Sequence, residues 1–353
     1  MKILAINPGS TSTKIAVYTD NTLYKASVVH DREMINQFSD IYDQKDFRFE
    51  CINSILKEEG WDVLSFDAFV GRGGFINPVE GGVYKVNNRM LEDLKIGVGG
   101  VHACNLGGVL ADMFAGKESK PAYIVDPVVI DEMEDVARVS GMAGVERKSF
   151  FHALNQKAIA REVAESLNKN YEDLNLIVAH LGGGISVGAH KKGRVVDVNN
   201  ALSGDGPFSP ERSGGLPVNG ICELIKEKNY TPDELINTIS RKGGVYSYTG
   251  IVDIQELEKR HLDDDIKATA VLDAMIYQIV KEIGGLAAIL GGDVDGIILT
   301  GGIAFSTLIT SRIKEKTGFI ADVFVKPGEF EMEALIGGVQ RVLSGSEQAK
   351  EYV

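Results

Sequence analysis

Three basic side chains stand where a cation could meet an anionic ligand. Lys14 closes the polar stretch "NPGSTSTK", Arg72 lies within "VGRGG", and Arg212 lies within "GPFSPERSGGLP", which is too rich in Gly, Pro and Ser for a helix interior. A solvated surface position is the ordinary alternative for any arginine. Neighbouring glycines instead favour a guanidinium that projects into a cleft, where two such groups could hold a carboxylate and a phosphoryl group through forked hydrogen bonds.

Three glycine-bearing turns follow expected strands, at residues 7–14, 182–184 and 301–302. Glycine lets backbone N–H groups approach phosphate oxygens without a Cβ in the way, and a helix N-terminus adds positive potential. The first turn is not a Walker A loop, which would read Gly-x-x-x-x-Gly-Lys-Ser/Thr before a helix, and a plain β-hairpin is its alternative. Glycine at one strand end is ordinary, but three such turns on one chain indicate a bound nucleotide.

Two carboxylates lie where magnesium ligands are common. Asp126 ends a strand directly before Pro127, and Glu331 lies at the start of the last expected helix. A carboxylate at a strand end can hold magnesium directly or through water. The alternative is a turn or helix cap, because acids favour the first turn of a helix.

The six histidines fall into two groups. His102, His152 and His180 lie at the ends of elements, where they could donate hydrogen bonds to phosphoryl oxygens or be satisfied core residues. We expect the other three on the surface, because they lie in polar turns: His30, His190 and His261. Their spacing contains no metal signature such as His-Glu-x-x-His.

Strands and turns come in the same order twice along the chain. Strands expected at residues 2–6, 14–18 and 22–29 form a meander. The segment "LIVAHLGGGISVGAHKKGRVVDV", residues 176–198, repeats strand, turn, strand, turn, strand about 170 residues later. Such internal similarity predicts two related domains.

The rest of the chain alternates strands and helices, which is typical of an α/β protein. Further strands are expected at 66–70, 122–125, 294–302 and 322–325. Helices are expected at 46–59, 153–167, 220–227, 232–240, 254–260 and 264–290. We expect an N-terminal domain at 1–151 and a nucleotide-binding C-terminal domain at 152–353. A terminal helix at 330–343 is expected to pack back on the N-terminal domain.

Composition excludes some partners. The chain has 353 residues and a net charge of −13, which disfavours nucleic acid and anionic membranes because both need a basic face. The most apolar segment, 268–290, carries Asp273, Lys281 and Glu282 and therefore predicts a core helix, not a membrane span. Three widely spaced cysteines and an N-terminus without a long apolar run fit a cytoplasmic protein.

Five motifs, in order along nearly the full chain, resemble those of the acetate and butyrate kinase family: "NPGSTSTK", "FFHALNQK", "AHLGGGIS", "DGPFSPERSG" and "TGGIA". The resemblance implies the fold shared by actin, the 70-kilodalton heat-shock proteins and sugar kinases. That fold has two duplicated domains of the ribonuclease H-like type, each with a mixed five-stranded sheet, and an interdomain cleft. "INPGSTSTK", "VDPVV" and "DVNNALSGDGPFSPERSG" look like the butyrate and branched-chain fatty-acid kinases within the family.

The resemblance also implies residue roles. Asn7 and Glu331 would organise Mg²⁺, with Glu329 and Glu333 as alternatives in "GEFEMEAL", and Lys14 would contact an ATP phosphate. Arg72 would bind the substrate carboxylate, Asp126 would orient the reacting groups, and His152 and Arg212 would stabilise the transition state. The nucleotide would be bound by a larger set: His180, Leu181, Gly182, Gly183, Gly184, Asp253, Thr300, Gly301, Gly302, Ile303 and Ala304.

The implied reaction is reversible phosphoryl transfer between ATP and butyrate or a similar short or branched carboxylate, which gives ADP and an acyl phosphate. A carboxylate is already ionised at neutral pH, so direct in-line transfer needs charge neutralisation and positioning more than a base. Acetate or propionate is the alternative substrate, and a non-catalytic, nucleotide-switched actin-like protein is the alternative class. A homodimer or higher homo-oligomer is expected.

Overall fold

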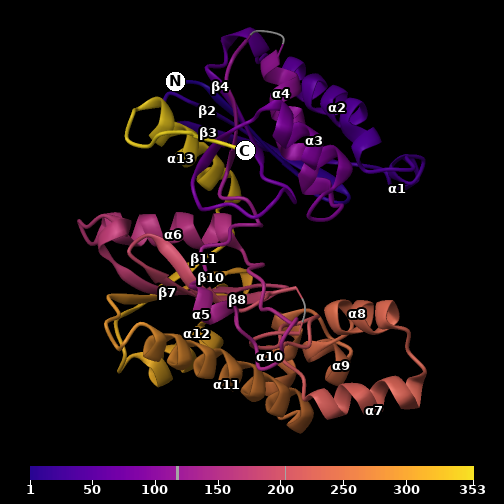
Figure 1. Cartoon of the computed structure of the whole chain (residues 1–353), viewed down its shortest axis with the longest axis vertical. Coiled ribbons are helices and arrows are strands. Elements are labelled where there is room, and N and C mark those ends of the chain that lie inside the picture. Colours follow the sequence, from indigo (N-terminus) through magenta and orange to yellow (C-terminus); the bar gives the residue numbers. More distant parts are fainter. Residues whose placement is uncertain (117–118, 203) are drawn as a thin grey trace. The chain divides into compact units, whose positions relative to one another are not determined.

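The computed structural model describes residues 1–116, 119–202 and 204–353 (Figure 1). The chain forms two compact units. The first contains Met1–Ile130 together with Phe330–Val353, and the second contains Asp131–Glu329. The expected domain boundary at residues 151/152 remains a prediction about the duplicated domains.

The first unit is built on a seven-stranded sheet in the order β12-β5-β6-β4-β1-β2-β3. β1 (Ile3–Pro8), β2 (Ser12–Thr19) and β3 (Thr22–Val29) form the antiparallel meander, with Asn7 opposite Lys14. β4 (Ala68–Arg72) lies parallel to β1, and β6 (Ala122–Val125) lies parallel to β4. Two short strands extend this edge: β5 (Val83–Lys85) and β12 (Lys350–Glu351).

Helices cover both faces of this sheet. α13 (Glu331–Leu343) packs against β1, β4 and β6, and α4 (Leu106–Gly116) packs against the same three strands. Figure 1 shows α13 on one side of the sheet and α2 (Lys45–Glu58), α3 (Asn88–Ile96) and α4 on the other. The shorter helical segments of this unit are α1 (Arg32–Ile35), η1 (Tyr42–Gln44), η2 (Val63–Ser65) and η3 (Ala103–Asn105).

The second unit is built on a five-stranded sheet in the order β11-β10-β7-β8-β9. β7 (Asn175–Leu181), β8 (Ile185–Lys191) and β9 (Arg194–Val198) are antiparallel neighbours, whereas β10 (Gly296–Gly301) and β11 (Val323–Pro327) run parallel to β7. α6 (Ala153–Ser166) covers one face, and α11 (Ile266–Ile289) and α12 (Thr307–Thr317) cover the other (Figure 1).

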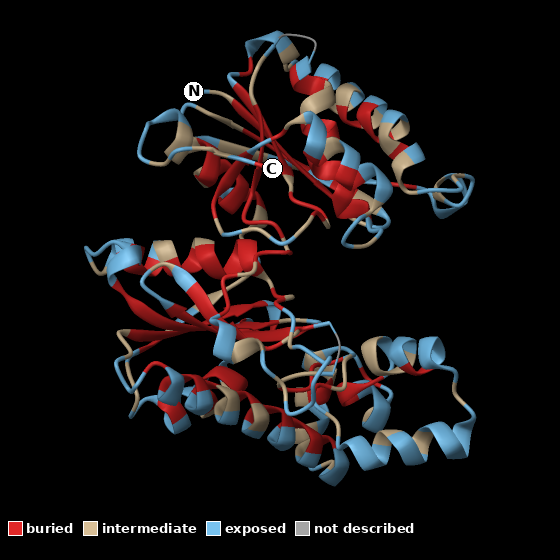
Figure 2. Ribbon diagram, in the orientation of Figure 1, coloured by how far each residue is buried: buried red, intermediate tan, exposed pale blue. Residues whose placement is uncertain are grey.

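The core of the second unit lies between its sheet and α11. Ile177, Leu272, Ile276 and Leu299 are fully or almost fully buried there. Figure 2 shows the strands as the most buried elements, while α7 (Val218–Lys228) has no buried residue. The other helical segments are α5 (Asp135–Arg138), η4 (Tyr171–Asp173), α8 (Pro232–Arg241), α9 (Gly244–Thr249), α10 (Ile254–Leu262) and η5 (Gly302–Phe305).

The two sheets share one strand order. β6-β4-β1-β2-β3 in the first unit matches β11-β10-β7-β8-β9 in the second, with an antiparallel meander followed by two parallel strands in each. The expected mixed α/β fold is therefore confirmed. The expectation of five strands per sheet is wrong for the first unit, because β5 and β12 pair beyond β6. No helix among the described residues is both long and apolar enough to span a bilayer.

Candidate functional site

Asn7, Arg72 and Glu331 meet in the first unit although they lie far apart in sequence. Asn7 and Arg72 lie near the ends of the parallel strands β1 and β4, and Glu331 is the first residue of α13. The Asn7 Nδ2 donates to Glu331 Oε2 at 2.6 Å, and the Arg72 Nη1 lies 2.5 Å from Glu331 Oε1. Both carboxylate oxygens of Glu331 are thus paired, and the Asn7 amide keeps its Oδ1 as an acceptor.

Of the three candidate acids, Glu331 is the one that contacts Asn7. Glu333 forms an exposed ion pair with Lys25, and Glu329 belongs to the second unit. Amide and carboxylate oxygens suit Mg²⁺, which keeps several waters and takes few protein ligands. Among the described residues no group of three or more His, Cys, Asp or Glu side chains is placed to hold a metal. Asn7 and Glu331 therefore fit only a magnesium ion whose other ligands come from phosphate and water.

Close packing fixes the backbone at Arg72. A Cβ at Gly71 would lie 1.9 Å from the Gly107 carbonyl oxygen, and a Cβ at Gly107 would lie 2.2 Å from the Arg72 carbonyl oxygen. Only glycine allows β4 and the first turn of α4 to approach this closely. The end of β4 is therefore held rigidly, and the guanidinium of Arg72 remains partly exposed.

Asp126 is buried directly after β6 and has a left-handed backbone with φ 37°, which residues other than glycine rarely adopt. Its Oδ1 accepts from the Gly82 N–H at 2.8 Å, and its own N–H donates to the Gly82 carbonyl at 3.0 Å. This pairing holds a strained residue in place at the end of β6. Its expected role in orienting reacting groups remains a prediction.

A buried arginine that sequence reasoning missed holds the first turn. Arg48 on α2 is fully buried, and its Nη1 donates to the carbonyls of Gly9 at 2.9 Å and Ser12 at 3.3 Å and to Thr13 Oγ1 at 3.0 Å. Its Nε and Nη2 donate to Gln44 Oε1 at 3.1 and 2.9 Å. Burial lowers the pKa of Arg48 to about 10, so the group stays charged at neutral pH. The local sequence "FRFECIN" gives no sign of this burial, because one arginine in an expected helix carries no positional signal.

The hydrogen bonds from Arg48 orient the carbonyls of the first turn toward α2. Besides the bonds from Arg48, the Thr11 carbonyl accepts from the His30 N–H at 2.9 Å. In a planar trans peptide the N–H points opposite to the preceding C=O. Because the Gly9 and Ser10 carbonyls accept from Arg48 at 2.9 and 3.5 Å, the N–H groups of Ser10 and Thr11 face away from Arg48, on the side where an anion could meet them. Lys14, expected to contact ATP phosphate, is exposed on β2.

In the second unit the glycine turn 182–184 lies against Arg212. A Cβ at Gly184 would lie 2.1 Å from the Arg212 Nη1, which donates to the Ala201 carbonyl at 2.6 Å. The Ser209 Oγ donates to the Gly183 carbonyl at 2.6 Å and accepts from the Arg212 N–H at 3.2 Å. Burial lowers the pKa of Arg212, and Glu211 opposes that shift. A guanidinium is thus held against backbone that carries no side chain.

Two predicted site histidines stack on each other. The rings of His152 and His180 have centroids 3.8 Å apart and planes 10° apart. His152 precedes α6 and His180 lies in β7. The His152 Nδ1 lies 2.8 Å from Ser186 Oγ, and the His180 Nδ1 lies 2.8 Å from Asn155 Oδ1. Two residues that are distant in sequence therefore share one place in the second unit.

Two of the three histidines expected on the surface are buried. His30 is 3% exposed beside Thr13, and His190 is fully buried beside Tyr171. The expectation was wrong because polar neighbours in "HDR" and "AHKKG" mark the strand ends, while the histidine side chains point inward. His261 is partly exposed and bonds to Thr269. His102 is exposed and caps η3 through Cys104.

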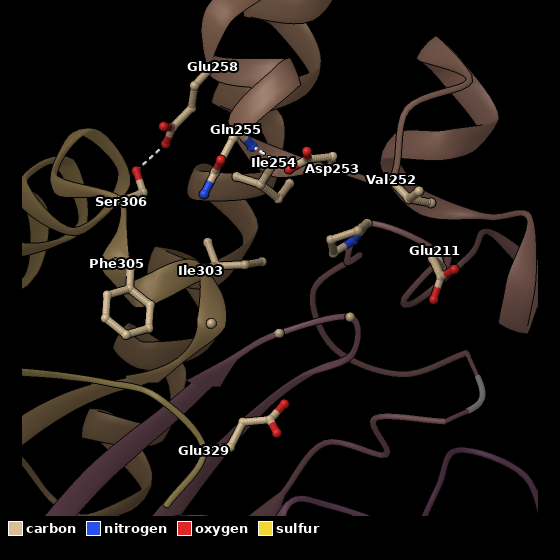
Figure 3. A pocket seen from close by; sticks show the side chains of 14 residues that line it. Glu211, Val252, Asp253, Ile254, Gln255, Glu258, Ile303, Phe305, Ser306 and Glu329 are labelled. Atoms are coloured by element: carbon tan, nitrogen blue, oxygen red, sulfur yellow. Dashed lines mark hydrogen bonds between the residues drawn. The ribbon is translucent and has the colours of Figure 1, made fainter. Parts of the chain in front are cut away.

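A pocket of about 640 Å³ lies in the second unit (Figure 3), within the size range of small-molecule sites. Its wall includes five residues of the expected nucleotide set: Gly182, Gly183, Asp253, Gly302 and Ile303. Apolar side chains of Val252, Ile254 and Phe305 also line it. Asp253 accepts from the Gln255 N–H and so begins α10, while Glu258 accepts from the Ser306 hydroxyl.

The other members of the expected nucleotide set do not line this pocket. They are His180, Leu181, Gly184, Thr300, Gly301 and Ala304. Leu181, Thr300 and Ala304 are buried, and the Thr300 Oγ1 donates to the Gly328 carbonyl at 3.1 Å. Gly301 has φ 87°, and a Cβ there would lie 2.4 Å from the Leu181 carbonyl oxygen. These residues shape the strand ends beneath the pocket, and nucleotide contacts by them remain predictions.

A family model described as the acetokinase family matches residues 122–319, more than half of the chain. The chain belongs to the acetokinase family. The match includes Asp126, His152, the turn 182–184 and Arg212, whereas Asn7, Arg72 and Glu331 lie outside it.

Solved structures agree on the fold. The acetokinase-family chain is similar to the acetate kinase of Porphyromonas gingivalis, with a TM-score of 0.78, 19% identity, and 97% of this chain and 99% of that chain covered. A propionate kinase from Francisella tularensis subsp. tularensis SCHU S4 gives a TM-score of 0.74 at 17% identity, covering 95% and 98%. The acetate kinase of Entamoeba histolytica gives 0.73 at 16% identity, covering 96% and 99%.

Proposed function

We propose that this acetokinase-family protein transfers the γ-phosphoryl group of ATP to butyrate or a similar short or branched-chain fatty acid. The products are ADP and an acyl phosphate, and the reaction is reversible. The observation that carries the proposal is the contact of Asn7 and Arg72 with Glu331, which gathers a guanidinium for a carboxylate and oxygen ligands for Mg²⁺. Family membership supports a kinase that acts on a carboxyl group.

The proposed chemistry needs no activated nucleophile. A carboxylic acid is ionised at neutral pH, since carboxyl groups titrate near pH 4, so its oxygen can attack phosphorus directly. Catalysis then depends on alignment and on neutralising charge at the transferred group. Arg72 binds the substrate carboxylate, Arg212 neutralises charge on the phosphoryl oxygens, and His152 donates a hydrogen bond to them. Magnesium, when bound by Asn7 and Glu331 with phosphate and water, supplies further charge neutralisation.

We assign the nucleotide to the pocket of the second unit. Val252, Ile254, Ile303 and Phe305 offer apolar surface for a base (Figure 3), and the glycine backbone at 182–183 offers close approach for phosphates. Acidic side chains on the wall suit hydroxyl groups of a ribose, because a carboxylate only accepts hydrogen bonds. The Asp253 carboxylate caps α10, so we assign to Asp253 a role in positioning the backbone of the pocket wall.

Substrate size is the finer part of the proposal. It depends on the resemblance of the Arg212 loop and of "HLGGG" to butyrate kinases. Val70, Phe75 and Phe151 are our candidates for the wall of the acid site, and of these only Phe75 is partly exposed, while Val70 and Phe151 are core residues. Acetate or propionate is the second candidate substrate, favoured by the names of the similar solved structures. A buried methylene is worth about 1–3 kcal/mol, so neighbouring acids should differ by roughly 10- to 200-fold in kcat/KM.

A hydroxylamine trap tests the proposal. The protein is incubated with ATP, Mg²⁺ and hydroxylamine, with acetate, propionate, butyrate, isobutyrate or isovalerate as the acid, and the hydroxamate is measured. We expect the highest kcat/KM with the four-carbon or branched acids. Acetate equal to or better than butyrate would assign the second candidate. Slow ATP hydrolysis without hydroxamate for any acid would contradict a carboxylate kinase and favour a nucleotide-switched binding protein.

We further propose a cytoplasmic homodimer or higher homo-oligomer without nucleic-acid or membrane partners. Light scattering on the purified chain tests the number of subunits. A monomer at all concentrations would contradict that part of the proposal and leave the reaction unaffected.

A further inference from the structure

A chain of buried polar side chains in the second unit ends at His152. It begins at Tyr171 in η4, continues through His190 in β8 and Gln156 in α6, and reaches Ser186 in β8. Ser186, Gln156 and His190 are fully buried and Tyr171 is 3% exposed. Four groups that water cannot reach must satisfy each other, because a buried polar group without a partner is costly.

Each link of the chain is a hydrogen bond of ordinary length. The Tyr171 hydroxyl lies 2.7 Å from His190 Nδ1, and His190 Nε2 lies 3.0 Å from Gln156 Oε1. The Gln156 Nε2 donates to Ser186 Oγ at 2.8 Å, and Ser186 Oγ lies 2.8 Å from His152 Nδ1. The chain therefore connects Tyr171 to the His152 ring without a gap.

The direction of each bond follows from the amide of Gln156. Its Nε2 also donates to the Ser186 carbonyl at 3.0 Å, which fixes which end of the amide carries hydrogens. Gln156 Oε1 must then accept, so His190 carries its proton on Nε2. The other nitrogen, His190 Nδ1, accepts from the Tyr171 hydroxyl. Burial, with Lys157 and Arg161 nearby, lowers the pKa of His190 well below its usual value, so this ring is neutral.

Ser186 transmits this direction to His152. A hydroxyl has one hydrogen and two lone pairs. Ser186 Oγ accepts from Gln156 Nε2 and, at 3.4 Å, from the His152 backbone N–H. Its single hydrogen is left to donate to His152 Nδ1. The Nδ1 atom of His152 therefore carries no proton, and the neutral ring holds its proton on Nε2.

The stacked partner has the opposite arrangement. Asn155 Nδ2 donates to the carbonyls of Gly328 at 3.3 Å and Glu329 at 2.6 Å, so Asn155 Oδ1 accepts. His180 therefore donates from Nδ1 to that oxygen. A Cβ at Gly182 would lie 3.0 Å from His180 Nε2, so this atom lies beside the glycine turn. The two parallel rings thus differ at Nδ1, which accepts in His152 and donates in His180.

We propose that Tyr171, His190, Gln156 and Ser186 are positioning residues that hold His152 as the neutral tautomer with its proton on Nε2, so that this atom is a fixed hydrogen-bond donor. The tautomer assignment stands on the hydrogen bonds alone, whereas its use on a phosphoryl oxygen rests on the proposed function. The chain acts through His152 and touches no ligand itself.

Nitrogen NMR on protein labelled at the histidine rings tests the assignment directly. The wild-type His152 Nδ1 should give the shift of an unprotonated acceptor nitrogen and Nε2 that of a protonated one, while His180 Nδ1 should give the shift of a protonated nitrogen. This readout needs no substrate, so it decides the inference whether or not the protein is a carboxylate kinase. A protonated His152 Nδ1 in the wild type would overturn the inference, even if every variant failed to fold.

Ser186→Ala removes the final donor. Both ring nitrogens of His152 should move toward intermediate shifts, because neither tautomer is then preferred. We expect kcat for acyl phosphate formation to fall about 10- to 100-fold, by analogy with the loss of hydrogen-bond partners of metal-binding histidines. KM should change little, because a loss felt only in the transition state lowers kcat and kcat/KM equally. Tyr171→Phe, at the far end, should shift the His152 nitrogens in the same direction by less.

Thr317→Val is the matched control. Thr317 is 1% exposed in the same unit, and its Oγ1 donates to the Ile313 carbonyl at 2.8 Å, outside the chain. It removes an equally buried hydroxyl and should leave the His152 nitrogens unchanged. Identical His152 shifts in Ser186→Ala and the wild type would contradict the positioning role, as would equal changes in Thr317→Val.

Discussion

The turn between the first two strands differs between the two sheets, although five strands have the same order in both. In the first sheet, residues 9–11 form a turn whose carbonyls bind the buried guanidinium of Arg48. In the second sheet, Gly182–Gly184 form a turn of the same length, and the guanidinium of Arg212 lies against Gly184. Arg48 binds the carbonyls of its turn, whereas Arg212 lies beside a glycine of its turn.

This difference shows that the strand order and the side chains around the turns have separate roles. A strand order can be duplicated because it depends on backbone pairing and on apolar faces. The side chains around each turn then decide what the turn can bind. A cation beneath a turn orients backbone N–H groups outward, whereas a cation beside a glycine turn can itself meet a ligand. Variants at the two turns should therefore fail in different ways.

The largest effect is expected at the second turn. Arg212→Ala should lower kcat about 10²–10³-fold, or roughly 3–4 kcal/mol, which is the cost of deleting one transition-state donor. Gly184→Ala should lower kcat in the same direction, because the new Cβ would occupy the place of Arg212 Nη1 while the backbone stays in place. Steady-state kinetics with butyrate measure both, with circular dichroism as the check on folding. Wild-type kcat in Arg212→Ala would remove that residue from the site.

Variants of the first turn should instead lower the free energy of unfolding. Arg48→Met removes the donor of the Gly9 carbonyl and of Gln44 Oε1, while the Ser12 carbonyl keeps the Gly9 N–H at 2.7 Å. We expect a loss of about 3 kcal/mol in the free energy of unfolding. Urea unfolding measures this loss. Arg48→Lys keeps the charge but not the forked donors, so it should recover only part of the stability. If Arg48→Met unfolded like the wild type, the hydrogen bonds from Arg48 would have no structural role. The two turns would then not differ in the way proposed.

Acid should weaken the first turn by a predictable amount. Burial, with Arg48 nearby, lowers the pKa of His30 to about 4, while an unfolded chain has a histidine pKa near 6.5. Between these values the unfolded state binds a proton that the folded state does not, so stability falls as pH falls. From pH 7 to pH 5 the loss should be about 2 kcal/mol, and it should stop below pH 4. His30→Gln should have a shallower pH dependence in urea unfolding, and an unchanged slope would contradict this assignment.

The smallest effect concerns magnesium in the first unit. Asn7→Ala and Glu331→Ala should each raise the magnesium concentration for half-maximal activity by about tenfold or more. Glu333→Ala, which removes only the exposed pair with Lys25, should behave like the wild type. Magnesium titrations that overlay for all three variants would contradict a metal role for the Asn7–Glu331 contact. An effect confined to Glu333 would assign the metal to Glu333, two residues after Glu331.

Sequence alone could predict the elements whose signal is local. The two meanders, α6 and α11 follow from alternation or helical periodicity, and the strand that became β6 was predicted residue for residue. The helix α4 was missed because Gly107 and Gly108 disfavour a helix by intrinsic propensity. The structure explains them by close packing on Gly71 and Arg72 of β4, a contact 36 residues away that no local rule contains.

The same limit applied to the site. The order of motifs predicts a set of site residues that includes Asn7 and Glu331 from distant parts of the chain, and the structure brings these two into contact. It could not predict the residues that support them. Arg48, Gln156 and Ser186 are buried polar side chains, and their positions follow from tertiary packing, not from spacing.

The membership of α13 and β12 in the first unit has a consequence for synthesis on the ribosome. The second unit is one continuous segment, Asp131–Glu329, whereas the first unit needs Phe330–Val353 to complete its sheet and to supply Glu331. Translation therefore delivers every strand of the second unit before the first unit has its full set. Since compact units generally fold as wholes, the half of the protein that begins the sequence is the half that finishes folding last.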